Sequence, residues 1–317
     1  MSLSIVVPVY NEYKNIKLFL NKINPILNKI TNNHEIIFVL DPSEDNTEEI
    51  ILNEIQQDKK IKLIKFSRRF GQPAALLAGI KNSVLDNVVL IDVDLQDPPE
   101  LIEKMYLLRK ENFDTILAKR SKKKKENFIR NIISTVGYKI INSLSETKIP
   151  ENVGEFRLIS RRIVEEIKKM EERDFFLRGA NSFIGFKQKI IYFERDARKE
   201  GETKYNKYTG SLKIGLNGIF SFSTKPLHFI TIISAVSFFS SFLIFTIYLI
   251  LTSLKLFVFK YQFFVIILIL MVSSLIFFSQ GIIAEYLSRL IVDIKKRPSY
   301  IIDKKVNFEE EKWKKLF

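Results

Sequence analysis

The chain has 317 residues, no cysteine and two histidines, and its formal net charge is +14. The lack of cysteine excludes disulfides, thiolate nucleophiles and cysteine-based zinc sites, and two histidines exclude a metal site built on several imidazoles. The charge predicts an anionic partner, and because two long uncharged segments lie near the C-terminus, we expect lipid phosphate rather than nucleic acid.

The first part of the chain alternates strand-length apolar runs with segments of helical periodicity. The runs occupy residues 4–9, 35–40, 61–66 and 88–91. This alternation predicts an α/β fold with a doubly wound, mainly parallel sheet of the Rossmann type. No Gly-x-Gly-x-x-Gly follows the first run, which disfavours a dinucleotide-binding oxidoreductase.

Polar residues follow each of these runs, where an open α/β sheet binds its ligands. They are Asn11, Glu12, Asp41, Ser67 to Arg69, Asp92 and Asp94. Two carboxylates one residue apart suit Mg²⁺ or Mn²⁺ and leave positions for diphosphate oxygens. Taken singly, each residue is an ordinary cap or turn residue. Together they predict a nucleotide pocket with a metal.

A basic segment precedes a predicted amphipathic helix at 128–144. Residues 119–130 include seven Lys or Arg and one acid. Such a segment can meet anionic headgroups at a membrane surface, although a solvated loop before a core helix is the alternative. Arg130 and Ser134 lie one helical turn apart, so both can reach one phosphate.

Two segments without any Asp, Glu, Lys or Arg occupy residues 226–254 and 261–284. Both exceed the roughly 20 residues needed to cross a bilayer. They predict a transmembrane hairpin with helices at about 227–254 and 261–287. Lys and Arg are more frequent after the second segment than between the two, so the positive-inside rule places both termini in the cytoplasm.

These features divide the chain into four parts. We expect a cytoplasmic catalytic domain at 1–206, a juxtamembrane interfacial segment at 207–225, two transmembrane helices within 226–288 and a basic cytoplasmic tail at 289–317. The first ten residues lack the basic start of a signal peptide. The expected location is therefore the inner (cell) membrane, as a multi-pass protein.

Three strings carry a resemblance to a known family: IVVPVYNE at 5–12, FSRRFGQPAALLAG at 66–79 and LIDVDLQDPPE at 90–100. They resemble family-2 inverting glycosyltransferases of the GT-A fold, in particular the polyprenyl-phosphate glycosyltransferases, which include dolichyl-phosphate mannose synthase and the bactoprenol glucosyltransferases. Further matches at 152–162, 198–205, 220–227 and 284–302 extend the resemblance over nearly the whole chain.

The resemblance implies roles for individual residues on the donor side of the site. The residues implied to line the base and ribose are Pro8, Tyr10, Glu12 and Asp41. Those implied to hold the metal and diphosphate are Asp92, Asp94 and Gln96, with Asp94 as the foremost ligand. Arg198 and Lys204 would belong to a loop that closes over the donor.

On the acceptor side, the resemblance implies that Arg120, Arg130 and Ser134 grip the lipid phosphate. Glu155 stands where the family commonly has aspartate, in the string Gly-Glu-Phe-Arg-Leu at 154–158. The implied catalytic group is Asp94, Asp92, Glu155 and Arg198.

The expected reaction is metal-dependent, inverting transfer of a sugar from a nucleotide diphosphate, with UDP-glucose favoured, to undecaprenyl phosphate for cell-envelope glycosylation. A transferase with a hydroxyl acceptor and a non-enzymatic nucleotide-binding membrane scaffold are the alternatives. Polysaccharide synthases usually carry Gln-x-x-Arg-Trp, whereas the only tryptophan here is Trp313. The exact lipid, sugar, choice of Mg²⁺ or Mn²⁺ and oligomeric state, a homo-oligomer included, stay open.

Overall fold

The computed structural model describes residues 2–121, 153–170, 176–194, 225–254 and 261–308. Its strands are β1 Leu3–Val9, β2 His34–Leu40, β3 Ile61–Phe66, β4 Asn87–Leu90, β5 Thr115–Arg120, β6 Val153–Ser160, β7 Gln188–Phe193 and β8 Ile302–Val306. Its helices are α1 Tyr13–Ile30, α2 Thr47–Gln57, α3 Gln72–Asn82, α4 Leu101–Lys110, α6 Arg161–Lys169, α7 Leu177–Ile184, α9 Lys225–Ser253 and α10 Tyr261–Ile294.

The strands form one sheet in the order β7-β5-β6-β4-β1-β2-β3-β8. Strands β4, β1, β2 and β3 are parallel neighbours, whereas β6 runs antiparallel to β4 and β5 and β8 runs antiparallel to β3. The predicted α/β fold is therefore correct, but the sheet is mixed. Almost every residue of β1 and β2 is buried, because helices cover both faces.

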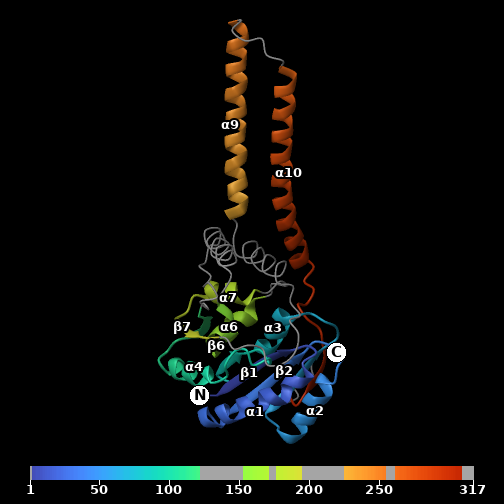
Figure 1. The fold of residues 1–317 in the computed structure, drawn as a ribbon, viewed down its shortest axis with the longest axis vertical. Helices are drawn as coiled ribbons and strands as arrows, with labels where there is room; N and C mark the ends of the chain where they lie inside the picture. The colour runs from blue at the N-terminus through green and yellow to red at the C-terminus, as the bar shows by residue number, and fades with distance from the viewer. Residues whose placement is uncertain (1, 122–152, 171–175, 195–224, 255–260, 309–317) are drawn as a thin grey trace.

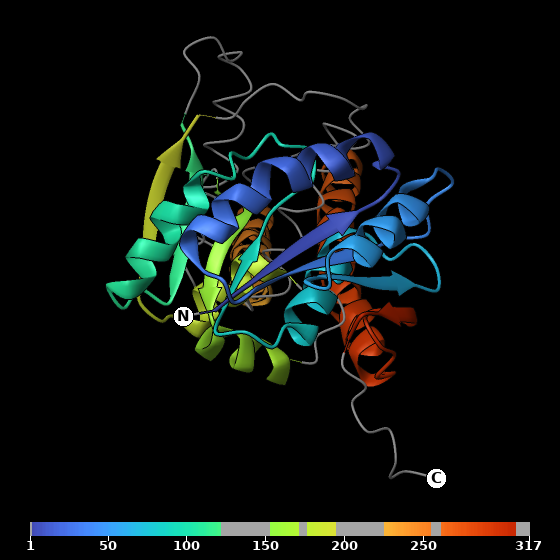
Figure 2. The ribbon, with the colours of Figure 1, turned by 90° about the horizontal axis from the view of Figure 1, so that it is seen from below.

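Two helix layers enclose the sheet, which runs between them in Figure 2. Helices α1, α2 and α4 pack on one face, and α3, α6 and α7 pack on the other. Helix α3 lies so close to β1 that a Cβ on Gly79 would stand 2.1 Å from Cγ1 of Val6. Only glycine fits there.

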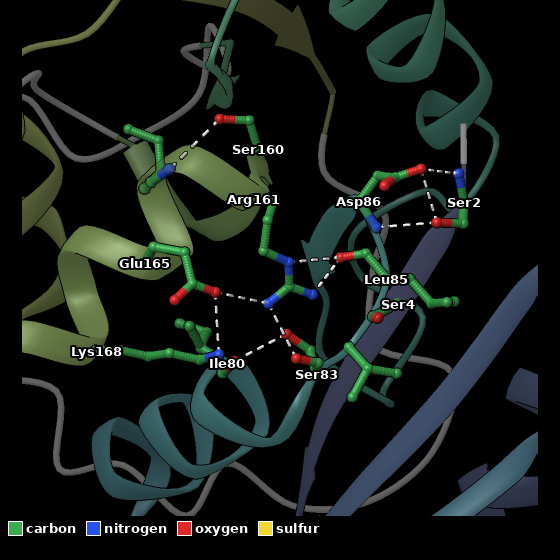
Figure 3. Close-up of polar contacts among 12 residues, drawn as sticks. Ser2, Ser4, Ile80, Ser83, Leu85, Asp86, Ser160, Arg161, Glu165 and Lys168 are labelled. Atoms are coloured by element: carbon green, nitrogen blue, oxygen red, sulfur yellow. Dashed lines mark hydrogen bonds and ion pairs between the residues drawn. The ribbon is translucent and has the colours of Figure 1, made fainter.

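At the amino edge of β4, Arg161 holds the connection between α3 and β4 (Figure 3). Its guanidinium donates to the carbonyl oxygens of Ser83 and Leu85. Nearby, the carboxylate of Asp86 accepts from both the backbone amide and the hydroxyl of Ser2, at 2.9 Å each. These contacts join the chain start to the edge opposite the predicted site.

Helices α9 and α10 lie side by side and extend away from the α/β domain (Figure 1). Within the described residues, one stretch, Val272–Ile294 of α10, is long and apolar enough to cross a membrane. The predicted two-helix membrane hairpin is thus not confirmed. Large apolar side chains such as Phe239 on α9 and Phe277 on α10 are 68% and 72% exposed.

The chain returns to the sheet after α10, because β8 pairs with β3. Ile302 pairs with Phe66 and Val306 with Leu63, so the chain enters at the carboxyl end of β3. This segment belongs to the predicted basic tail, and its sequence did not indicate a strand. Its residues 303–305 are charged and exposed, which suits a sheet edge, since charge there opposes pairing with further strands.

Candidate functional site

The carboxyl ends of β1, β2, β3 and β4 meet at one edge of the sheet, and most of the predicted site residues follow them. Strand β6 begins at the same edge. Leu90 of β4 pairs with Arg157 of β6 in antiparallel register, so Glu155 and Asp92, each two residues beyond that pair, lie at this edge. Arg120 ends β5, which is antiparallel to β6 and therefore finishes here too.

The loops after β1 and β2 are joined through Asn11. Its backbone amide donates to the Ser43 hydroxyl, and its side-chain oxygen accepts from the Glu44 amide, both at 2.9 Å. Asn11 takes φ of 51°, a left-handed conformation that asparagine tolerates better than most residues. Glu12 is held beside it, because its amide donates to the Thr47 hydroxyl. These contacts hold the loops after β1 and β2 against each other.

Asp41 anchors the loop after β3. Its two carboxylate oxygens accept from the backbone amides of Phe70 at 2.9 Å and Gly71 at 3.0 Å. That loop carries Arg69, whose guanidinium lies 3.9 Å from the centre of the Tyr10 ring. Pro8, also predicted to line the donor pocket, pairs with Val39 inside the sheet, two residues before Tyr10.

Asp92 and Asp94 follow β4 directly. Oδ1 of Asp92 accepts from the side-chain amide of Gln72 at 2.7 Å, and Oδ1 of Asp94 accepts from the Gln96 backbone amide at 3.2 Å. Leu95, which lies between Asp94 and Gln96, takes φ of 56°. A left-handed branched residue is unfavourable, and such strain clusters at functional sites. The strained turn fixes where Asp94 and Gln96 lie.

These oxygen donors fit Mg²⁺ or Mn²⁺. Such a cation is commonly held by one or two carboxylates and completed by substrate phosphates. Among the described residues, no three His, Cys, Asp or Glu side chains gather into a complete metal site. Asp92 and Asp94, with Gln96 beside them, therefore suit a cation that arrives with a diphosphate.

Arginines surround Glu155 on the other side of the edge. The Arg178 Nε donates to its Oε1 at 2.8 Å, and Arg157 Nη2 lies 3.2 Å from its Oε2. Arg120 lies against the backbone here, since a Cβ on Gly154 would stand 3.3 Å from its Nη2. Arg157 is 1% exposed and also donates to the Gly154 carbonyl at 2.7 Å.

The charges in this cluster change one another's protonation. Burial opposes ionisation of Glu155, but Arg178 and Arg157 outweigh it, so the pKa of Glu155 lies below its ordinary value. Burial lowers the pKa of Arg157 to about 10, which leaves it cationic at neutral pH. Glu155 is therefore an ionised partner of arginines.

The structure brings Tyr10, Glu12, Asp41, Asp92, Asp94, Gln96, Arg120 and Glu155 to one edge. Arg130, Ser134, Arg198 and Lys204 lie outside the described residues. Sequence reasoning missed Gln72, Arg157 and Arg178 as parts of this edge. Gln72 lies within the string at 66–79, which was a usable signal, whereas Arg178 stands in no pattern that would have marked it.

A doubly wound α/β sheet with two aspartates and several arginines at its carboxyl edge is an α/β protein whose charged site lies where this class of fold binds its ligands. The sequence comparisons specify the family. The family model described as Glycosyl transferase family 2 matches residues 4–168. The chain belongs to this family, and curated relatives match it over nearly its full length.

Three of these relatives are instructive. An uncharacterized glycosyltransferase of Bacillus subtilis is 35% identical, covering 98% of this chain and 95% of the relative. The prophage bactoprenol glucosyl transferase homolog of Escherichia coli is 36% identical, covering 95% and 98%. The SfII prophage-derived bactoprenol glucosyl transferase of Shigella flexneri is 35% identical, covering 96% and 98%.

Proposed function

We propose that this chain transfers a sugar from a nucleotide diphosphate to a polyprenyl phosphate, with UDP-glucose and undecaprenyl phosphate as the best candidates. The names of the bactoprenol glucosyl transferases, which match over nearly the full length, support a polyprenyl acceptor. Transfer would invert the anomeric carbon and supply a lipid-linked sugar for cell-envelope glycosylation.

The observation that carries this proposal is the division of one sheet edge into an acidic and a cationic side. Asp92 and Asp94 suit the donor's metal-bound diphosphate. Arg120 and Arg178, close to Glu155, suit an anionic acceptor. A divalent cation, when bound, neutralises charge on the departing diphosphate. Three arginines, Arg120, Arg157 and Arg178, lie around the single carboxylate of Glu155, which favours an anionic acceptor over a neutral hydroxyl.

The contacts of Glu155 support a phosphate acceptor rather than a hydroxyl acceptor. A hydroxyl acceptor needs a general base, which typically contributes about 10²- to 10⁴-fold. A phosphate monoester has a second pKa of about 6 and arrives mostly ionised. Because two guanidinium groups hold Glu155 and lower its pKa, it is a poor proton acceptor and a good positioning group for Arg178.

The proposal includes α9 and α10 as a hairpin that spans the membrane. Their exposed apolar side chains need lipid around them. The start of α9 follows the catalytic domain, and β8 ties the chain after α10 into the same sheet. Both connections therefore lie on one side of the membrane, the cytoplasmic side by charge bias. Residues 295–301 span at most about 25 Å, which keeps the carboxyl edge of the sheet close to the end of α10.

The test uses purified full-length protein with undecaprenyl phosphate and radiolabelled UDP-glucose, UDP-galactose, UDP-N-acetylglucosamine or GDP-mannose. We expect label from one donor to enter the lipid phase only when Mg²⁺ or Mn²⁺ is present. Nucleotide binding without any transfer would favour the scaffold alternative. Transfer that proceeds equally well in a chelator would contradict the metal role of Asp92 and Asp94.

A further inference from the structure

The segment Ser299–Asn307, here called the return segment, ties α10 to the catalytic sheet at two points. Its strand β8 pairs with β3 from Phe66 back to Leu63. Beyond β8, the side-chain amide of Asn307 donates to the carbonyl oxygens of Lys59 at 2.6 Å and Ile61 at 2.7 Å. The return segment is therefore fastened along the whole length of β3.

Its first residues meet the loop that follows β3. The ring of Tyr300 stacks on Phe66, with 5.3 Å between centroids and 21° between planes. The carbonyl of Ile301 accepts from the Ser67 amide at 3.0 Å. Phe66 in turn meets the ring of Phe70 edge-on at 5.5 Å. Tyr300 thus supports, through Phe66, the loop at 67–71.

That loop is held from its other side by the site itself. Asp41 accepts from the amides of Phe70 and Gly71, and Arg69 stacks on Tyr10. Gln72, directly after the loop, donates to Asp92. A shift of the loop away from Phe66 would therefore move a cation beside the nucleotide pocket and a partner of a metal-binding aspartate.

We propose that Tyr300 is a positioning residue of the donor site, through which the segment leaving α10 sets the affinity for the nucleotide sugar. This inference rests on the proposed function for the identity of the donor. Tyr300 is far from the acceptor arginines in the sheet order, because β3 and β5 are separated by β2, β1, β4 and β6. Its effect belongs to donor binding and not to acceptor binding.

The test compares four variants of the full-length protein: Tyr300→Ala, Tyr300→Leu, Tyr300→Phe and Lys304→Ala. Leucine fills much of the space but cannot stack, phenylalanine keeps the stacked ring, and Lys304 is an exposed residue of β8. UDP-glucose affinity is measured by calorimetry with Mn²⁺ present. Amide hydrogen exchange of residues 67–71 is measured without any ligand, and thermal unfolding is followed in parallel.

We expect Tyr300→Ala and Tyr300→Leu to weaken UDP-glucose binding about threefold to tenfold, the effect of losing one aromatic pair, and to speed exchange in the loop. Tyr300→Phe and Lys304→Ala should match the wild type in both. If Tyr300→Ala does not fold, the UDP-glucose affinity and loop exchange of Tyr300→Leu test the inference.

A structural role confined to the sheet edge would lower the unfolding temperature of Tyr300→Leu while leaving loop exchange and UDP-glucose affinity unchanged, and that result would overturn the inference. If the wild type binds no UDP-glucose, the proposed donor is wrong. The exchange of residues 67–71 then decides the positioning role by itself.

Discussion

The two edges of the sheet use similar polar side chains in different ways. At the amino edge, Arg161 donates to backbone carbonyls, and Asp86 accepts from Ser2, so these contacts join chain segments to one another (Figure 3). At the carboxyl edge, Asp92, Asp94 and the arginines around Glu155 come from separate loops and strands and converge. Asn11 and Leu95 take left-handed conformations there.

The difference shows where the fold uses polar groups for stability and where it holds them for a ligand. Polar groups that mainly satisfy backbone atoms stabilise the fold. Groups that are gathered with like charges, or held by strained backbone, make sense when a charged ligand completes them. Substitutions at the two edges should therefore separate activity from stability.

The largest effect on activity is expected for Asp94→Asn. It removes the charge of the proposed metal ligand, and kcat should fall on the order of 10²- to 10³-fold, as for loss of one preorganised electrostatic group. The asparagine oxygen can still accept from Gln96, so thermal unfolding should change little. Titration with Mn²⁺ checks the mechanism, since the metal requirement should rise. Unchanged turnover at limiting metal would contradict it.

The matching change at the amino edge is Arg161→Ala. It removes a cation that donates to two backbone carbonyls, so the free energy of unfolding should drop by about 2–3 kcal/mol. The KM values for donor and acceptor should stay at wild-type level in the folded fraction. Urea unfolding and steady-state kinetics measure both quantities. A changed donor KM would show that the two edges are not independent.

Glu155→Gln should be milder than Asp94→Asn and should act on the acceptor. Glutamine keeps an oxygen for Arg178 but loses the charge, so the acceptor KM should rise about tenfold while the donor KM is unchanged. The acidic limb of the rate profile should still follow ionisation of the acceptor phosphate. Loss of that limb, with activity as low as in Asp94→Asn, would make Glu155 a catalytic base.

The same variant has a predicted pH signature in stability. The folded protein holds the pKa of Glu155 below 4.5, so the unfolded chain binds more protons in that range, and stability falls as pH falls. The charge of Glu155 therefore stabilises the fold above about pH 4.5. The wild type should unfold at a higher temperature than Glu155→Gln at pH 7. The difference between the two should shrink below about pH 4.5.

The smallest effect is expected for Arg69→Lys. An exposed cation over an aromatic ring contributes roughly 0.5–1 kcal/mol, and lysine keeps the charge but loses the planar stack on Tyr10. The donor KM should rise about twofold to fivefold, and the acceptor KM should not change. Steady-state kinetics with each substrate varied in turn distinguish these outcomes.

The parallel part of the fold could be predicted because its strands are uninterrupted apolar runs. The run at 4–9 became Leu3–Val9, and the run at 88–91 became Asn87–Leu90. The gathering of acidic residues at the carboxyl edge could also be predicted, because parallel strands all end at the same edge of a sheet. Strand β8 could not be predicted, because Asp303, Lys304 and Lys305 interrupt its pattern and it forms only against β3.

The acceptor side of the site was less accessible to sequence reasoning. Arg157 lies in a buried strand and Arg178 on the short helix α7, and only the antiparallel pairing of β6 brings the first to this edge. Long-range register of that kind leaves no local pattern. The resemblance marked Glu155 as a departure from the family, but its two arginine partners became visible only in the folded chain.

Whether the acceptor is a phosphate can be decided in one comparison. Purified full-length protein is given the donor that labels lipid best, together with either undecaprenyl phosphate or undecaprenol, which differ only in the phosphate. The division of the carboxyl edge into acidic and cationic sides predicts label in the lipid phase with undecaprenyl phosphate and none above background with undecaprenol. Equal labelling of both lipids would contradict it, because transfer would then not depend on a phosphate group on the acceptor.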